Sequence, residues 1–114
     1  MKRGDIIYIQ MVEGTGSEIG GMECRPAIIV SNDAANRFSP VIEVVYLTTR
    51  KKKNLPTHIF VKSSPRPSTA MCEQVSSVSK QRIYQSVGAV TQREMEQIDQ
   101  ALRISLGLDE RSAP

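Results

Sequence analysis

The stretch Pro26-Ala27-Ile28-Ile29-Val30-Ser31 decides the fold of this 114-residue chain. Its apolar residues are continuous rather than alternating, which is typical of a strand buried on both faces. On either side of this stretch, we expect a first strand over residues 5–10 and a third over residues 42–48, which is rich in β-branched side chains. Between the first two strands, residues 13–21 carry four glycines in nine positions and predict a loop that another backbone can approach closely.

The second half of the chain contains shorter apolar segments separated by polar and proline-rich ones. Prolines exclude regular structure from residues 63–68, and residues 32–40 are expected to form a connection. Residues 78–83 fit either a strand or a helical turn. Short strands are predicted at 57–62, 71–75 and 86–90.

A helix beginning after Thr91 is the clearest predicted element. Thr91-Gln92-Arg93-Glu94 has the capping-box pattern of a hydroxyl followed three residues later by a carboxylate, and Gly107 is expected to end the helix. One stripe at helical spacing contains Met95, Ile98, Ala101, Leu102, Ser105 and Leu106. Many short strands followed by one helix indicate a single domain over residues 1–114, mainly β, with the helix packed on a small barrel or folded sheet.

Composition narrows the range of partners and compartments. The net charge of +3 and the pI near 9.1 favour an anionic partner such as nucleic acid. No apolar run reaches the roughly 20 residues that cross a bilayer, and the N-terminal apolar stretch is too short for a signal peptide. We therefore expect a cytoplasmic protein without a membrane partner, in which Cys24 and Cys72 are free thiols.

The residues usually used by hydrolases are scarce. With one histidine and no clustered cysteines, neither a metal site nor a cofactor is expected, and His58 is predicted to be structural rather than catalytic. Catalysis must then rest on arginine, hydroxyl and carboxylate side chains. RNA transesterification suits that set, because the substrate's own 2′-hydroxyl is the nucleophile and the protein need only position it and neutralise charge on the phosphate.

An ordered series of short motifs over residues 2–108 resembles the MazF/PemK toxins of type II toxin–antitoxin modules. The motifs are Lys2-Arg3-Gly4-Asp5-Ile6, Gly16-Ser17-Glu18-Ile19-Gly20-Gly21, residues 25–33, residues 36–40, Leu47-Thr48, Leu55-Pro56-Thr57-His58, Glu73-Gln74-Val75 and residues 99–107. The resemblance implies an SH3-like small β-barrel of the MazF/PemK/CcdB kind with a C-terminal helix. It also implies a homodimer neutralised by a MazE-like antitoxin.

The same resemblance implies a function: metal-independent, sequence-specific cleavage of single-stranded mRNA, leaving a 5′-hydroxyl and a cyclic or 3′-phosphate end and arresting growth. Carried over by position, Arg25 and Thr48 are the catalytic pair. Thr48 and Thr49 alternate along a strand, so we expect only one of them to face the site. The expected RNA-binding residues are Ser17, Glu18, Gly20, Gly21, Thr49, Arg50, Lys51 and Gln74.

Two alternatives remain open at the level of sequence. One is a non-enzymatic CcdB-like toxin that poisons DNA gyrase, although such proteins typically use a tryptophan of the C-terminal helix and this chain has none. The other is a degenerate family member that has lost its activity.

Overall fold

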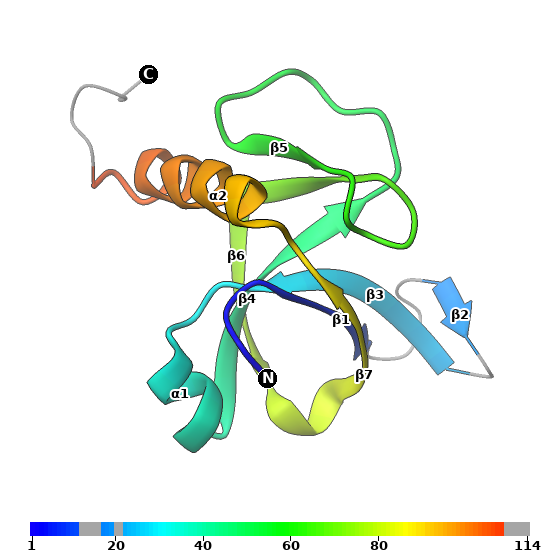
Figure 1. Cartoon of the computed structure of the whole chain (residues 1–114). Helices are drawn as coiled ribbons and strands as arrows, with labels where there is room; N and C mark the ends of the chain where they lie inside the picture. Colours follow the sequence, from blue (N-terminus) through cyan, green and yellow to red (C-terminus); the bar gives the residue numbers. More distant parts are fainter. Residues whose placement is uncertain (12–16, 20–21, 109–114) are drawn as a thin grey trace.

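The computed structural model describes residues 1–11, 17–19 and 22–108, and its main feature is a strongly curved antiparallel sheet (Figure 1). The continuous path of paired strands is β5-β6-β4-β3-β1-β7, and β2 pairs with β3 outside this path. The strands are β1 (Asp5–Gln10), β2 (Ser17–Ile19), β3 (Met22–Ile29), β4 (Val41–Thr48), β5 (His58–Val61), β6 (Ser68–Ser79) and β7 (Ile83–Ala89). The described residues also form three helical segments, namely α1 (Asp33–Phe38), the 3₁₀ turn η1 (Lys80–Arg82) and α2 (Gln92–Ser105).

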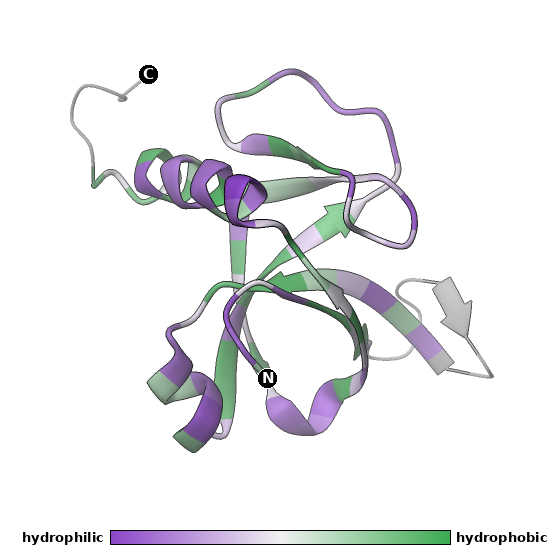
Figure 2. Cartoon of the chain, viewed as in Figure 1, coloured by the Kyte–Doolittle hydropathy of each residue, from purple (hydrophilic) through white to green (hydrophobic). Residues whose placement is uncertain are grey.

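The sheet is packed on both faces, as the continuous apolar run of β3 predicts. Ile28 points to one face and its neighbours Ala27 and Ile29 to the other, and all three are fully buried. Hydrophobic residues accordingly concentrate along the central strands (Figure 2). The helix-side core contains Ile6, Ile28, Val45, Leu47, Val61, Ala70, Cys72, Ile98, Ala101 and Leu102. The inner core, inside the curve of the sheet, contains Ile7, Ile9, Ala27, Ile29, Ile42, Val44, Tyr46, Met71 and Val78.

The C-terminal helix has the predicted start and end. The Thr91 hydroxyl accepts a hydrogen bond from the Glu94 backbone N–H, and the Glu94 carboxylate accepts one from the Thr91 N–H. Gly107 follows the last turn with a φ of +71°, the left-handed conformation that glycine adopts readily. The predicted apolar stripe is wrong at Leu106, which is 59% exposed because the helix ends one residue earlier.

Several predicted boundaries need correction, each for a local reason. Residues 32–40 contain the short helix α1, whose start is stabilised by Asn32, because its side chain accepts a hydrogen bond from the Ala35 N–H. The ambiguous segment 78–83 is divided between the end of β6, the turn η1 and the first residue of β7. The strand β6 is longer than predicted because it pairs with two neighbours, β5 over its first residues and β4 along its length.

Candidate functional site

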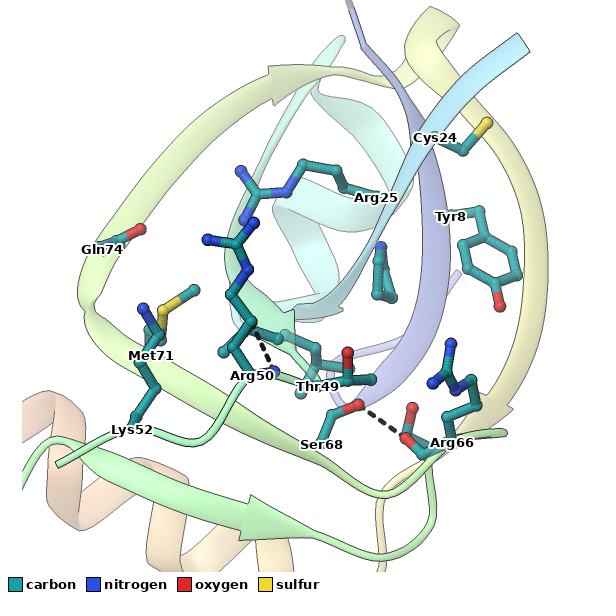
Figure 3. A pocket seen from close by; sticks show the side chains of 14 residues that line it. Tyr8, Cys24, Arg25, Thr49, Arg50, Lys52, Arg66, Ser68, Met71 and Gln74 are labelled. Carbon is teal, nitrogen blue, oxygen red and sulfur yellow. Dashed lines mark hydrogen bonds between the residues drawn. The ribbon is translucent and has the colours of Figure 1, made fainter. Parts of the chain in front are cut away.

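A pocket of about 720 Å³ opens on the concave side of the sheet, between β3, the ends of β4 and β6, and the loops that adjoin them. It is open to solvent. Its lining comprises Tyr8, Cys24, Arg25, Pro26, Leu47, Thr48, Thr49, Arg50, Lys52, Ser64, Arg66, Ser68, Met71 and Gln74 (Figure 3). Five of the residues singled out from sequence therefore share one cavity, including both members of the predicted catalytic pair.

Strand register explains why Arg25 and Thr48 meet. The strands β3 and β4 pair antiparallel with Ala27 opposite Tyr46, and both of these side chains belong to the inner core. Arg25 and Thr48 lie two residues farther along each strand. Because side chains alternate between the faces of a sheet, both emerge on the same concave face, where both line the pocket.

The Arg25 side chain rests on an aromatic ring. Its guanidinium carbon lies 4.4 Å from the centre of the Tyr46 ring, and that ring is buried in the inner core. A cation over a tyrosine face is attracted by the ring's negative π-surface. Arg25 is thus held by a rigid platform and directed toward the pocket, which it shares with Arg50 from the loop after β4 (Figure 3).

The Thr48 hydroxyl already takes part in one hydrogen bond, as an acceptor. Its oxygen accepts a hydrogen bond of 3.2 Å from the Arg50 backbone N–H, so its own proton remains available to a group in the pocket. The expectation that only one of Thr48 and Thr49 faces the site is wrong, because both line the pocket. The strand ends at Thr48, so strict alternation does not extend to Thr49, which is the first residue after the strand.

The pocket is strongly positive. Arg25, Arg50, Lys52 and Arg66 all line it, whereas the lining residues that the structure describes include no aspartate or glutamate. Such a cluster attracts a polyanion and can contact several phosphates. Arg66 belongs to the connection between β5 and β6, where its carbonyl accepts a 2.6 Å hydrogen bond from the Ser68 hydroxyl.

The β5–β6 connection is fastened to the helix by a buried carboxylate. Glu94, 9% exposed, accepts hydrogen bonds from the backbone N–H groups of Lys62 and Ser63 and from the Ser63 hydroxyl, besides that from Thr91. Burial raises the pKa of Glu94, but these hydrogen bonds outweigh it and hold the pKa below its usual range. The helix start therefore supports the connection that carries Arg66.

The remaining predicted binding residues have different positions. Gln74 lines the pocket, whereas Lys51 is exposed on the loop and is not part of the lining. Ser17 and Glu18 lie on β2, where they pair with Cys24 and Glu23 of β3, next to Arg25. Gly20 and Gly21 lie outside the described residues.

Sequence reasoning missed five polar side chains of the pocket, namely Tyr8, Lys52, Ser64, Arg66 and Ser68. Lys52 belongs to the run Arg50-Lys51-Lys52-Lys53, so the signal was present and only the position within the run was wrong. Tyr8 reaches the site because β1 pairs with β3 with Tyr8 opposite Pro26. Arg66 had no sequence signal, since its place across from Arg25 depends on how a proline-rich connection folds back.

The cysteines are unsuited to nucleophilic chemistry. Cys24 and Cys72 are free, as predicted, and both are buried. Burial raises the pKa of both thiols, that of Cys72 to about 12 with a further contribution from Glu73, so neither forms a thiolate near neutral pH.

Neither a metal-binding cluster nor a membrane-spanning helix is found in the part of the chain that the structure describes. Within those residues, no three or more histidine, cysteine, aspartate or glutamate side chains are grouped so as to hold a metal ion. None of the described helices is long and apolar enough to cross a membrane.

Comparison with known proteins agrees with this geometry. The family model described as PemK-like, MazF-like toxin of type II toxin-antitoxin system matches residues 2–106. The chain belongs to this family. Among the MazF-like toxins, it is 35% identical over 113 residues to the endoribonuclease EndoA of Bacillus subtilis, covering 95% of this chain and 96% of that protein. It is 33% identical to the endoribonuclease MazF of Staphylococcus saprophyticus, covering 95% and 92%.

Solved structures of MazF-like toxins have the same fold. A mycobacterial endoribonuclease in complex with its cognate antitoxin has a TM-score of 0.81 and 27% identity, covering 96% of this chain and 97% of that one. The MazF of Deinococcus radiodurans has a TM-score of 0.74 at 18% identity, which supports the fold alone. The predicted fold, mainly β with a C-terminal helix and MazF-like, is therefore confirmed.

Proposed function

We propose that this MazF-like toxin is an endoribonuclease that cleaves single-stranded RNA in the basic pocket, with Arg25 and Thr48 as its catalytic residues. The observation that carries the proposal is the meeting of Arg25, held on Tyr46, with the Thr48 hydroxyl in a cavity that has four positive side chains. Two relatives that are at least 33% identical over nearly the whole chain are named endoribonucleases. A site of this charge suits a substrate with one phosphate per nucleotide.

The reaction follows from what these residues can supply. The ribose 2′-oxygen attacks the adjacent phosphorus while the bond to the 5′-oxygen breaks, and the proton lost from the 2′-hydroxyl is balanced by the proton gained at the 5′-oxygen. The products are a 2′,3′-cyclic phosphate and a 5′-hydroxyl. Arg25 neutralises the charge that grows on the non-bridging oxygens, because a guanidinium is permanently charged and matches two phosphate oxygens. Thr48 donates its hydroxyl proton to the same group.

The other residues that line the pocket are expected to bind the RNA strand. Arg50, Lys52 and Arg66 contact phosphates on either side of the cleaved one, and Gln74 supplies hydrogen bonds to a base or sugar. Bases in an unpaired strand can be splayed into such a pocket, whereas those of a duplex cannot. The protein is therefore expected to require single-stranded RNA.

The partners proposed for the toxin are a MazE-like antitoxin and a second copy of the chain. A structural neighbour at 27% identity is an endoribonuclease in complex with its cognate antitoxin. An antitoxin that covers the basic pocket would carry acidic residues to complement its charge. Binding there would exclude RNA and so neutralise the toxin.

Cleavage of a long single-stranded RNA in excess EDTA tests the function. Wild-type protein should give discrete cuts with 5′-hydroxyl ends, whereas Arg25→Ala should cut at least a hundredfold more slowly. Arg93→Ala is the matched control, because Arg93 is an exposed arginine on α2 outside the pocket. Equal cleavage by Arg25→Ala and wild type would refute the assigned site. No cleavage by folded, antitoxin-free wild type would refute the function, and a gyrase supercoiling assay would then test a CcdB-like toxin.

A further inference from the structure

The single histidine of the chain lies outside the pocket but next to the loop that supplies part of its charge. His58 begins β5, and its side chain is only 8% exposed. Nδ1 lies 2.7 Å from the Lys53 carbonyl oxygen, and Nε2 lies 2.8 Å from Oε2 of Glu73 on β6. Both ring nitrogens therefore face hydrogen-bond acceptors.

This arrangement favours a charged ring. A neutral imidazole has one N–H and can donate to only one of two acceptors, whereas an imidazolium donates to both. The Lys53 carbonyl can only accept. Glu73 is also placed as an ionised acceptor, since its other oxygen accepts a 2.9 Å hydrogen bond from the Thr57 hydroxyl.

The environment of the pair agrees with the ionised form of both groups. Burial lowers the pKa of His58, but the hydrogen bonds to Glu73 and the Lys53 carbonyl outweigh burial and raise it above its ordinary 6.5. Burial raises the pKa of Glu73, but the hydrogen bonds from His58 and Thr57 contribute to holding it below its usual range. The His58 imidazolium and the Glu73 carboxylate thus stabilise one another's charge.

The pair fastens the basic loop (residues 49–57) to the sheet. The loop starts at the Arg50 N–H to Thr48 hydroxyl bond and ends where the Cys72 N–H donates to the Thr57 carbonyl. Between these points four successive basic residues repel one another. The Arg50 N–H joins the start of this charged run to β4, and the His58 ring joins its end to β5 through the Lys53 carbonyl, which also accepts a hydrogen bond from the Leu55 N–H. Arg50 and Lys52 of the run line the pocket.

We propose that His58 is a positioning residue whose protonated ring, together with Glu73, forms a clamp that holds the basic loop beside the basic pocket. RNA binding then weakens when the ring loses its proton. The inference rests on the proposed function, because it concerns the same pocket. It adds a pH dependence to the toxin that does not come from the reacting groups.

The sign of the effect follows from the raised pKa. The contribution of the clamp is complete below pH 6.5 and is lost as the pH rises through the higher pKa of folded His58. The charges that act on the ring are Glu73 from β6, which favours the proton, and Lys52 from the loop, which opposes it. The adjacent Cys72 thiol has a pKa raised to about 12 and does not titrate in this range.

NMR tests the clamp without RNA, and the single histidine makes the assignment unambiguous. The ring ¹⁵N shifts should titrate with a midpoint above 6.5 and show both nitrogens protonated at pH values below it, and the backbone amides of residues 50–55 and 57 should titrate with the same midpoint. Glu73→Gln should lower the midpoint, since it removes the carboxylate charge. A ring that is neutral at pH 6, or loop amides that do not follow it, would overturn the proposal.

RNA affinity tests the consequence. We would measure the Kd of wild-type protein for a mixed-sequence 2′-fluoro RNA, which lacks the attacking hydroxyl, from pH 6 to 9 at constant ionic strength. Affinity should fall by about tenfold through the His58 midpoint, the scale of one lost charge-assisted hydrogen bond. His58→Gln should bind weakly and without this pH dependence, and in cleavage it should raise KM more than it lowers kcat.

The outcomes separate the two proposals. A wild-type Kd that does not change with pH overturns the role of His58, even if cleavage is robust. Coupled titration of ring and loop in a protein that cuts no RNA refutes the nuclease and leaves the clamp as a structural fact. If His58→Gln does not fold, wild type and Glu73→Gln still decide the question.

Discussion

Replacing Glu94 by glutamine should destabilise the protein far more than the loss of one charge on a helix surface. The wild-type carboxylate accepts four hydrogen bonds, three of them from backbone N–H groups of Lys62, Ser63 and Thr91. A glutamine keeps one accepting oxygen and turns an NH₂ group toward the remaining donors. Two partly buried donors then lose their partner, at a cost of about 1–3 kcal/mol each.

We take about 3 kcal/mol as the loss of unfolding free energy. With an unfolding entropy of about 2.1 cal/mol/K per residue, the 114-residue chain has about 0.24 kcal/mol/K, and the melting temperature falls by about 12 °C. Thermal and urea denaturation measure this, at equal protein concentration because any dimer stabilises by mass action. Glu96→Gln is the matched control, since Glu96 is exposed on the same helix.

The effect should depend on pH in a defined direction. The pKa of folded Glu94 lies below its ordinary 4.5, so its contribution is present above that pH and is lost as the pH falls through the lower, folded pKa. The difference between wild type and Glu94→Gln should therefore close in acid. A melting temperature within about 3 °C of that of Glu96→Gln at pH 7 would refute the reasoning, since it is only about a quarter of the expected shift.

Three further predictions concern the pocket and the helix end. Thr48→Val removes the hydroxyl proton and should lower the single-turnover cleavage rate about a hundredfold, while Thr48→Ser should keep most of the activity; equal rates for the two variants would contradict a donor role. Lys52→Ala and Arg66→Ala should each reduce the slope of log affinity for RNA against log salt concentration by about 0.7. Lys51→Ala, which lies outside the pocket lining, should reduce the slope less, and titrations at several salt concentrations measure the difference. Gly107→Ala should cost about 1 kcal/mol in urea denaturation, because no atom of the described residues lies within 4 Å of the added Cβ and the left-handed backbone opposes the substitution. An unchanged midpoint would argue against that helix end.

Local patterns determined much of the fold. The capping box at Thr91 and the glycine at position 107 define both ends of α2 by local hydrogen bonding and backbone conformation, which depend on neighbours in the chain. The apolar run of β3 predicted burial on both faces, because such a strand has no polar side to give to solvent. Leu106 was misplaced because helical periodicity does not reveal where the partner surface ends.

The family pattern pointed to Arg25 and Thr48, but only the tertiary structure brought them together. Their meeting depends on the register between β3 and β4, because a one-residue slip would turn the side chains of one strand to the other face of the sheet. The pairing of β1 with β3 likewise brought Tyr8 to the pocket, and the β5–β6 connection, held by Glu94, brought Arg66. The partners of His58 were equally invisible in sequence, since Glu73 lies on a different strand. Sequence determined the elements because their signals are local, and tertiary structure decided the site because its residues meet through long-range register and packing.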